Sequence, residues 1–259
     1  MSQLIQKLKI AAPLEVPPLG FTGVSKAKTK PRPVLVARVS GEEKQSSSLV
    51  KGADAVFIDT FQEEVADRFI KQLEKETTKM PYGCWLGNMV HCQNDFFALN
   101  LDADMNQIKE TEAGKALVVE PDIEDKYLRQ LDNLPIDAIV IEDKERLSCR
   151  LTIKNYILCR RMALAVSKPL LIHVDLTITA QDIEEMWNYG IDGFVVDADP
   201  AFPAAVQELR QVIDKLDLDS RHKKIALVPI IPSVKNSAQD LNEPMPDEDD
   251  DEDDYDNDE

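Results

Sequence analysis

The sequence predicts a single (β/α)8 barrel, and three observations support this fold class. Two short apolar runs, Pro169–Val174 and Gly193–Val196, are rich in β-branched residues, which is typical of strands buried on both faces. A helical pattern separates them, so the stretch predicts a βαβ unit, and the same alternation recurs along the chain from Val34 to Val196. The chain has 259 residues, a length that suits one barrel of this type.

Residues 1–33 are predicted to form an N-terminal helix followed by a proline-rich arm. Ser2–Ile10 places Leu4, Ile5 and Leu8 on one side, which is the spacing of a short amphipathic helix. We expect this helix to cover one end of the barrel rather than to bind a membrane. The stretch from Pro13 to Pro33 contains five prolines and the run KAKTKPRP, which disfavours both helix and central strand.

Eight strands are predicted within the barrel, which is assigned to residues 34–219. Their ranges are Pro33–Val39, Ala53–Asp59, Gly83–Asn88, Phe96–Asp102, Lys115–Glu120, Ile136–Ile141, Pro169–Val174 and Gly193–Val196. About seven residues separate the third strand from the fourth, fewer than the dozen or so that a parallel crossover usually needs. This connection is the least regular part of the predicted barrel.

Helices are predicted between most of these strands. The ranges with helical spacing of apolar residues are Glu63–Lys79, Ile123–Leu131, Leu151–Val166 and Pro203–Leu216. Within the Lys168–Asp199 unit, we expect Thr179 to cap the helix at its start and Gly190 to end it. The polar stretch Gly41–Ser48 predicts that the first crossover is short or frayed.

Residues 220–235 are predicted to form an extended strap and residues 236–259 a disordered acidic tail. The apolar run Lys224–Pro232 forms most of the strap; if it is a strand instead, the strand count elsewhere is one too high. From Glu243 onward the chain has twelve acids and no base, a composition that cannot offset the entropy of ordering itself. The tail either keeps the protein soluble or binds basic groups, on a partner protein or in Lys26–Arg32 of the arm.

The charge balance argues against nucleic-acid binding. The net charge is −18, and without the twelve acids of the tail residues 1–242 carry only −6. Such an acidic body lacks the Lys/Arg surface that displaces phosphate counterions. No apolar run approaches the ~18–20 residues needed to span a bilayer, and no signal-peptide core is present, so a cytoplasmic location is expected.

The cysteines indicate reduced thiols, which fit a cytoplasmic protein. No CxxC spacing occurs among the four: Cys84, Cys92, Cys149 and Cys159. Trp85 and His91 lie near the first two, but the spacing matches no zinc pattern and favours a core or loop role. The sequence also lacks GxSxG, GxGxxG, HExxH and P-loop motifs.

The stretch from Thr179 to Val196 reads T-x-x-D-I-E-E-x-W-x-x-G-I-D-G-F-V-V. It resembles the last quarter of the phosphate-binding (β/α)8 barrels, the group that includes tryptophan-biosynthesis barrels and flavin-dependent relatives. The whole chain also resembles uncharacterised bacterial barrel proteins. In the phosphate-binding group, glycines after the seventh and eighth strands hold a phosphate, but here Asp175, Asp197 and Asp199 occupy those places. The resemblance therefore implies the fold, while the acids count against phosphate esters and flavin mononucleotide.

Functional groups of such barrels come from the C-terminal ends of the strands and the loops that follow them. Four residues there are candidates for catalysis: Arg38, Glu142, His173 and Asp175. Four more are candidate ligands for Mg²⁺ or Mn²⁺, which prefer oxygen donors: Asp59, Asp102, Glu120 and Asp197. His173 is the foremost candidate, as a general base, because Asp175 follows two positions on and would share its face.

A structural role competes with each of these assignments. An acid just after a strand often caps the next helix, and alternation turns only some of these side chains inward. A buried Arg38 would need acids from neighbouring strands as partners, and His173 has the alternative role of a hydrogen-bonded barrel histidine.

Three functions are compatible with these residues. A non-catalytic barrel that binds a small molecule or a basic partner protein, or acts as a scaffold, is favoured, because nine glycines are few for loops that approach a ligand closely. The alternative is a lyase, aldolase or isomerase acting on a small oxygenated metabolite, with Mg²⁺ as an optional cofactor. A flavin-dependent oxidoreductase is disfavoured because the phosphate-binding glycines are missing. In an enzyme the strand-end acids and His173 would converge on an open pocket; in a non-catalytic barrel helix caps and Arg pairs would occupy them.

Overall fold

The computed structural model describes residues 2–11, 31–40, 46–60, 62–76, 80–86, 94–105, 108, 111–142 and 152–218. The chain divides into two units, Met1–Ile225 and Ala226–Glu259, and every described residue belongs to the first. The predicted strap and acidic tail, and the proline-rich arm up to Lys30, lie outside the described residues.

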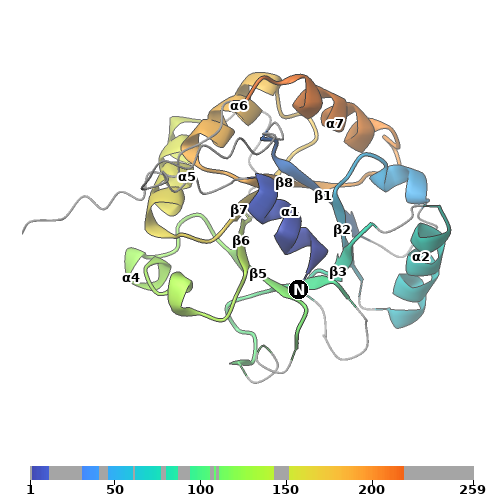
Figure 1. Ribbon diagram of the computed structural model, residues 1–259, viewed down its shortest axis with the longest axis horizontal. Coiled ribbons are helices and arrows are strands. Elements are labelled where there is room, and N and C mark those ends of the chain that lie inside the picture. The colour runs from blue at the N-terminus through green and yellow to red at the C-terminus, as the bar shows by residue number, and fades with distance from the viewer. Residues whose placement is uncertain are drawn as a thin grey trace, which may run out of the picture. The chain divides into compact units, whose positions relative to one another are not determined.

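Parallel strands close into a barrel in which each strand pairs with the next and the eighth pairs with the first (Figure 1). The strands are β1 (Val34–Ser40), β2 (Ala55–Asp59), β3 (Tyr82–Cys84), β4 (Phe96–Leu99), β5 (Gly114–Val119), β6 (Ala138–Ile141), β7 (Leu170–Val174) and β8 (Gly193–Asp197). This confirms the predicted (β/α)8 barrel. The short connection before β4 does not break the pattern, because β3 and β4 pair in parallel, with Gly83 opposite Phe96.

The third strand is shorter than the predicted range of Gly83–Asn88. It ends at Cys84, and Leu86 has a φ of 46°, in the left-handed region, which is incompatible with a continuing strand. Residues 87–93 lie outside the described part of the chain.

Among the described residues, α-helices separate β2 from β3, β5 from β6, β6 from β7 and β7 from β8, and helices surround the barrel in Figure 1. The described helices are α1 (Gln3–Ala11), α2 (Glu63–Glu76), α4 (Asp125–Leu128), α5 (Ile153–Ala165), α6 (Ala180–Tyr189) and α7 (Ala205–Lys215), with 3-10 turns at Ser47–Val50 and Leu131–Asn133. The predicted acidic helix after β5 is thus reduced to α4 and one 3-10 turn. Both predicted ends of α6 are confirmed: Thr179 forms a capping box with Asp182, and Gly190 has a φ of 112°.

The apolar core has two layers, one between the strands and the outer helices and one inside the barrel. Leu4, Ile5 and Leu8 of α1 are buried in the inner layer together with Phe57 and Phe96. Figure 1 shows α1 lying across the ring of strands. The prediction that the N-terminal helix covers one end of the barrel is therefore confirmed.

Hydrogen bonds join the start of α1 to Asp95, in the loop before β4. Asp95 accepts hydrogen bonds from the backbone N–H groups of Gln3 and Leu4, at 2.8 and 3.0 Å, and from the Ser2 hydroxyl at 2.7 Å. These bonds satisfy donors at the helix start that have no partner within the helix. α1 therefore closes the end of the barrel at which the strands begin.

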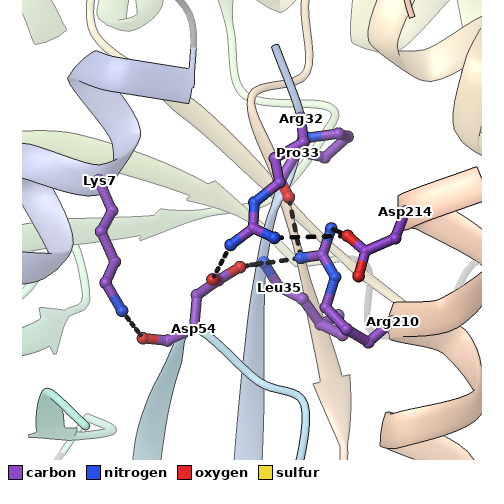
Figure 2. A network of polar contacts seen from close by, with 7 residues as sticks. All are labelled: Lys7, Arg32, Pro33, Leu35, Asp54, Arg210 and Asp214. Atoms are coloured by element: carbon purple, nitrogen blue, oxygen red, sulfur yellow. Dashed lines mark hydrogen bonds and ion pairs between the residues drawn. The ribbon is translucent and has the colours of Figure 1, made fainter. Parts of the chain in front are cut away.

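Asp54 joins several elements at the same end of the barrel (Figure 2). Its Oδ2 accepts from the backbone N–H of Leu35 and from Nη1 of Arg210 on α7, both at 3.0 Å, and its Oδ1 accepts from Arg32 at 3.1 Å. Arg210 also pairs with Asp214 one turn later, at 2.7 Å. This network holds β1, β2 and α7 together and leaves the opposite end of the barrel for the candidate site.

No helix among the residues that the structure describes is both long enough and apolar enough to cross a membrane.

Candidate functional site

The strands end in a layer of charged side chains inside the barrel. The inward positions of β1 and β8 are apolar or glycine until Arg38 and Asp197, and on β7 Leu171 is followed by His173. Glu142 continues the inward phase of β6 one residue beyond its end. Because parallel strands end on the same side of the sheet, these side chains meet at the C-terminal mouth of the barrel.

Arg38 binds two carboxylates from different strands. Its Nε and Nη2 donate to the two oxygens of Asp197, at 2.6 and 3.2 Å, while Nη1 donates to Glu142 Oε1 at 2.8 Å. The planar guanidinium suits this forked arrangement. Asp197 lies on β8, which neighbours β1 as expected for a partner of Arg38, whereas Glu142 follows β6, which does not pair with β1.

His173 lies between the same two carboxylates. Its Nδ1 is 3.4 Å from Glu142 Oε1, its Nε2 is 3.3 Å from Asp197 Oδ1, and its side chain is only 5% exposed. Burial by itself lowers the pKa of His173, but the hydrogen bonds to Asp197 and Glu142 outweigh it, so the pKa is raised. These contacts therefore favour protonation of His173 relative to a free imidazole, because an imidazolium can donate from both nitrogens.

The same contacts shift the pKa values of Glu142 and Asp197 downward. Burial alone would raise the pKa values of Glu142 and Asp197, yet hydrogen bonds from His173 and Arg38 hold both below their ordinary values. Burial also opposes the charge of Arg38, but Asp197 and Glu142 raise its pKa. Two positive and two negative groups thus neutralise one another within the mouth.

Asp59, at the end of β2, belongs to the same charged layer. Burial raises its pKa, and although Arg38 opposes this, the negative charges of Asp197 and Glu142 add to it. The pKa of Asp59 is therefore shifted in the opposite direction from those of Glu142 and Asp197.

Trp85 forms the apolar neighbour of the charged cluster. It is 3% exposed, its ring centre lies 4.9 Å from Cζ of Arg38 and 6.4 Å from that of His173, and it packs edge-on against Phe57. The ring adds a cation–π contact to the ion pairs of Arg38. Sequence reasoning assigned Trp85 a core or loop role but missed this contact; its place directly after a strand was the available signal.

The other predicted site residues lie apart from this cluster. Asp175 is exposed, and its Oδ1 accepts from the backbone N–H and the hydroxyl of Thr177, at 3.1 and 3.2 Å. β7 ends at Val174, so the expected shared face of His173 and Asp175 does not extend to Asp175. Its carboxylate serves its own loop and does not contact the imidazole in any described bond.

The four predicted metal ligands are not gathered into a metal site. Asp59 and Asp197 lie in the charged cluster, while Asp102 and Glu120 are exposed in the loops after β4 and β5. Among the described residues, no three His, Cys, Asp or Glu side chains form a group that could hold a metal ion. Asp102 lies three residues beyond the end of β4, whereas Glu120 directly follows β5 in the inward phase of Ala116 but is exposed.

A pocket of about 530 Å³ lies beside the cluster, between the loops that follow β7 and β8. His173 and Asp197 form part of its wall, and the loops contribute Asp175, Asp199, Phe202 and Glu208 among others. The pocket falls in the range of about 300–1,000 Å³ that is typical of small-molecule sites.

Comparison with known proteins supports the fold and no more. No protein-family model matches the chain, and no curated protein matches it. Among solved structures, the tryptophan synthase complex from Pyrococcus furiosus has a TM-score of 0.54 at 13% identity, with 71% of this chain and 98% of that chain covered. The tryptophan synthase A-subunit from the same hyperthermophile has a TM-score of 0.51 at 12% identity, with coverage of 71% and 97%.

These neighbours confirm the resemblance that the Thr179–Val196 stretch indicated, at the level of the (β/α)8 fold. Identity this low shows a shared architecture only, because one barrel architecture supports many unrelated chemistries. The function must therefore be argued from the mouth of this barrel itself.

Proposed function

We propose that this protein is a non-catalytic barrel that binds a small molecule at its C-terminal mouth. One observation carries the proposal: the strand-end residues best suited to catalysis are bound to one another. Arg38, Glu142, His173 and Asp197 form a closed set of ion pairs at 2.6–3.4 Å.

This pairing is unfavourable for acid–base catalysis. A general base must be unprotonated and have a pKa near the operating pH. Both nitrogens of His173 are directed at carboxylates, and its raised pKa favours the protonated form, which cannot accept a further proton. The lowered pKa values of Glu142 and Asp197 keep them charged and weakly basic. These groups fit the role of a rigid polar wall better than that of a proton relay.

The neighbouring pocket supplies the binding function. Its volume of about 530 Å³ can hold a small metabolite, and its wall combines carboxylates with the apolar side chains of Val174, Leu176 and Phe202. A mixed wall of this kind is typical of small-molecule sites, in which apolar contacts supply affinity and a few polar groups orient the ligand.

An enzyme remains the second candidate, because His173 and Asp197 line the pocket themselves. A protonated imidazole is a proton donor, so a small oxygenated metabolite in the pocket would lie next to a general acid. A lyase, aldolase or isomerase reaction would be consistent with this contact.

Ligand-detected NMR of a small-metabolite library with the full chain separates the two candidates. We expect compounds that bind and remain chemically unchanged over hours. Phe202→Ala should weaken their binding, whereas Tyr127→Ala should not, because Tyr127 is a similarly exposed aromatic on α4, outside the pocket lining. Conversion of a bound compound that is lost in His173→Gln would favour the enzyme, and a library without any binder would contradict the binding function.

A further inference from the structure

The pocket wall is strongly negative. Four carboxylates line the pocket, those of Asp175, Asp197, Asp199 and Glu208, and none of the described lining residues is a lysine or arginine. Asp197 is neutralised by Arg38 and His173. The other three carboxylates form no ion pair with any described residue, so the described part of the pocket wall carries an uncompensated negative charge.

Two of these carboxylates are held in fixed positions. Asp175 Oδ1 accepts from Thr177 N–H at 3.1 Å, and Asp199 Oδ1 accepts from Ala201 N–H at 2.8 Å. Each carboxylate uses Oδ1 for its own loop, and both residues line the pocket. Fixed charges cost less ordering entropy when a ligand binds.

The start of α7 is the one feature at the pocket that would attract an anion. Ala204 and Ala205 line the pocket at this helix start. A helix N-terminus carries about half an elementary positive charge, and its effect is limited to the first turn. Three full carboxylate charges in the same wall outweigh it, so the pocket favours a cation.

The apolar part of the pocket wall favours a ligand with an apolar body. Leu176, Phe202 and Pro203 line the pocket, and Phe202 is 66% exposed in a region otherwise rich in acids. A hydrated inorganic cation would leave these groups without a partner, whereas an organic cation with an apolar body would cover them.

We propose that the pocket takes a small organic cation, an amine or guanidinium compound whose charged head lies near Asp175, Asp199 and Glu208 and whose apolar body covers Phe202. This inference rests on the proposed binding function and specifies its ligand class. It also explains why acids occupy the loops where the phosphate-binding barrels carry glycines.

Two matched probe sets test the charge preference in the full-length chain. One set is 2-phenylethylamine, 2-phenylethanol and phenylacetate; the other is putrescine, 1,4-butanediol and succinate. Within each set the carbon skeleton is similar and the head group is cationic, neutral or anionic. We expect the amines to bind about tenfold more tightly than the alcohols, which corresponds to about 1.4 kcal/mol, and the carboxylates to bind least. Ligand-detected NMR and titration calorimetry measure the dissociation constants.

Isosteric variants test which carboxylates cause the preference for amines. Asp199→Asn keeps an oxygen that can accept from Ala201 N–H, and Glu208→Gln keeps the side-chain shape, so both should fold. Each should weaken amine binding about three- to tenfold and leave alcohol binding unchanged. Asp67→Asn is the matched control, because Asp67 is an exposed acid on α2 that does not line the pocket.

The outcomes distinguish this inference from the function on which it rests. Alcohols or carboxylates that bind as tightly as the amines would overturn the cation preference while leaving a binding barrel in place. Amine binding that is unaffected by Asp199→Asn and Glu208→Gln would place the cation elsewhere and also overturn the inference. No binding by any probe, together with no binder in the metabolite library, would overturn both.

Discussion

Arg38 on β1 and Asp197 on β8 are register partners, and Nε of Arg38 donates to Asp197 Oδ1 at 2.6 Å across 159 residues of sequence. β1 and β8 are the first and last strands, so this ion pair spans the seam at which the barrel closes. Glu142 and His173 complete the charge balance from the two preceding strands. Stability of the seam and charge of the mouth therefore depend on the same residues.

Replacing Arg38 should destabilise the barrel strongly. Arg38→Gln leaves Glu142 and Asp197 with only His173 between them, and removing one partner of a buried pair costs on the order of 3 kcal/mol. Urea denaturation measures the free energy of unfolding. Lys126→Gln is the control, because its pair with Glu124 is more than half exposed and should contribute less than about 1 kcal/mol. Equal losses for the two variants would contradict a structural role for the Arg38 pairs.

The contribution of His173 to stability should depend on pH in a defined direction. Burial lowers the pKa of His173, but the contacts with Asp197 and Glu142 raise it by more than burial lowers it. The folded protein therefore holds the proton more tightly than the unfolded chain. The resulting stabilisation is complete below the ordinary value of 6.5 and is lost as the pH rises through the raised folded-state pKa. Glu142 and Asp197 have lowered pKa values, so their contribution is present above their ordinary values and is lost as the pH falls.

His173→Gln tests this dependence. The loss of unfolding free energy in the variant should be larger at about pH 5.5 than at about pH 9, since the stabilisation from the imidazolium is lost as the pH rises through the raised pKa. Urea titrations of both proteins at several pH values give the difference. A loss that stays constant over this range would show that His173 is not charged between its two carboxylates.

Asp54 should be essential to the opposite end of the barrel (Figure 2). Asp54→Ala removes the partner of the buried Arg210 guanidinium and of the Leu35 N–H, so we expect a loss on the order of 3 kcal/mol. Asp214→Ala removes a partner of the same arginine at a half-exposed position and should cost less than about 1 kcal/mol. Thermal unfolding of both variants checks this order, and a reversed order would contradict the central role of Asp54. Ligand binding at the mouth should be unchanged in both.

Gly190 is required for two separable reasons. Its φ of 112° disfavours any side chain, and an added Cβ would lie 2.6 Å from Cβ of Ala163 on α5. Gly190→Ala should therefore destabilise the protein by more than about 1 kcal/mol. In a double-mutant cycle with Ala163→Gly, the coupling energy should recover the steric part and leave the backbone strain. Strictly additive losses would show that α5 moves aside at little cost.

The order of strands and helices was accessible from sequence because it depends on local patterns. Short β-branched runs predicted the strands, and the capping residues Thr179 and Gly190 predicted both ends of α6. The end of β3 was not accessible, because the left-handed backbone of Leu86 is imposed by its surroundings and not by its residue type.

The residues of the candidate site could be predicted in part from the sequence. Extending the inward phase of the apolar strand positions by two residues selects Arg38, Asp59, Glu142, His173 and Asp197, but it also selects Glu120, which is exposed. Two residues beyond His173 the same phase reaches Asp175, and there it fails because β7 has ended and Thr177 donates to the carboxylate. Strand length, which decides where the rule stops, is set by pairing with neighbouring strands.

The sequence by itself determined the fold class, the approximate ranges of the strands, and the identity of the charged residues at their ends. These properties follow from the periodicity and residue types of short segments. Only the tertiary structure decided that Arg38 pairs with both Asp197 and Glu142 and that His173 lies between the same two acids. Those pairings require closure of the barrel, which brings strands distant in sequence into register, and a buried charge takes the partner that closure places beside it.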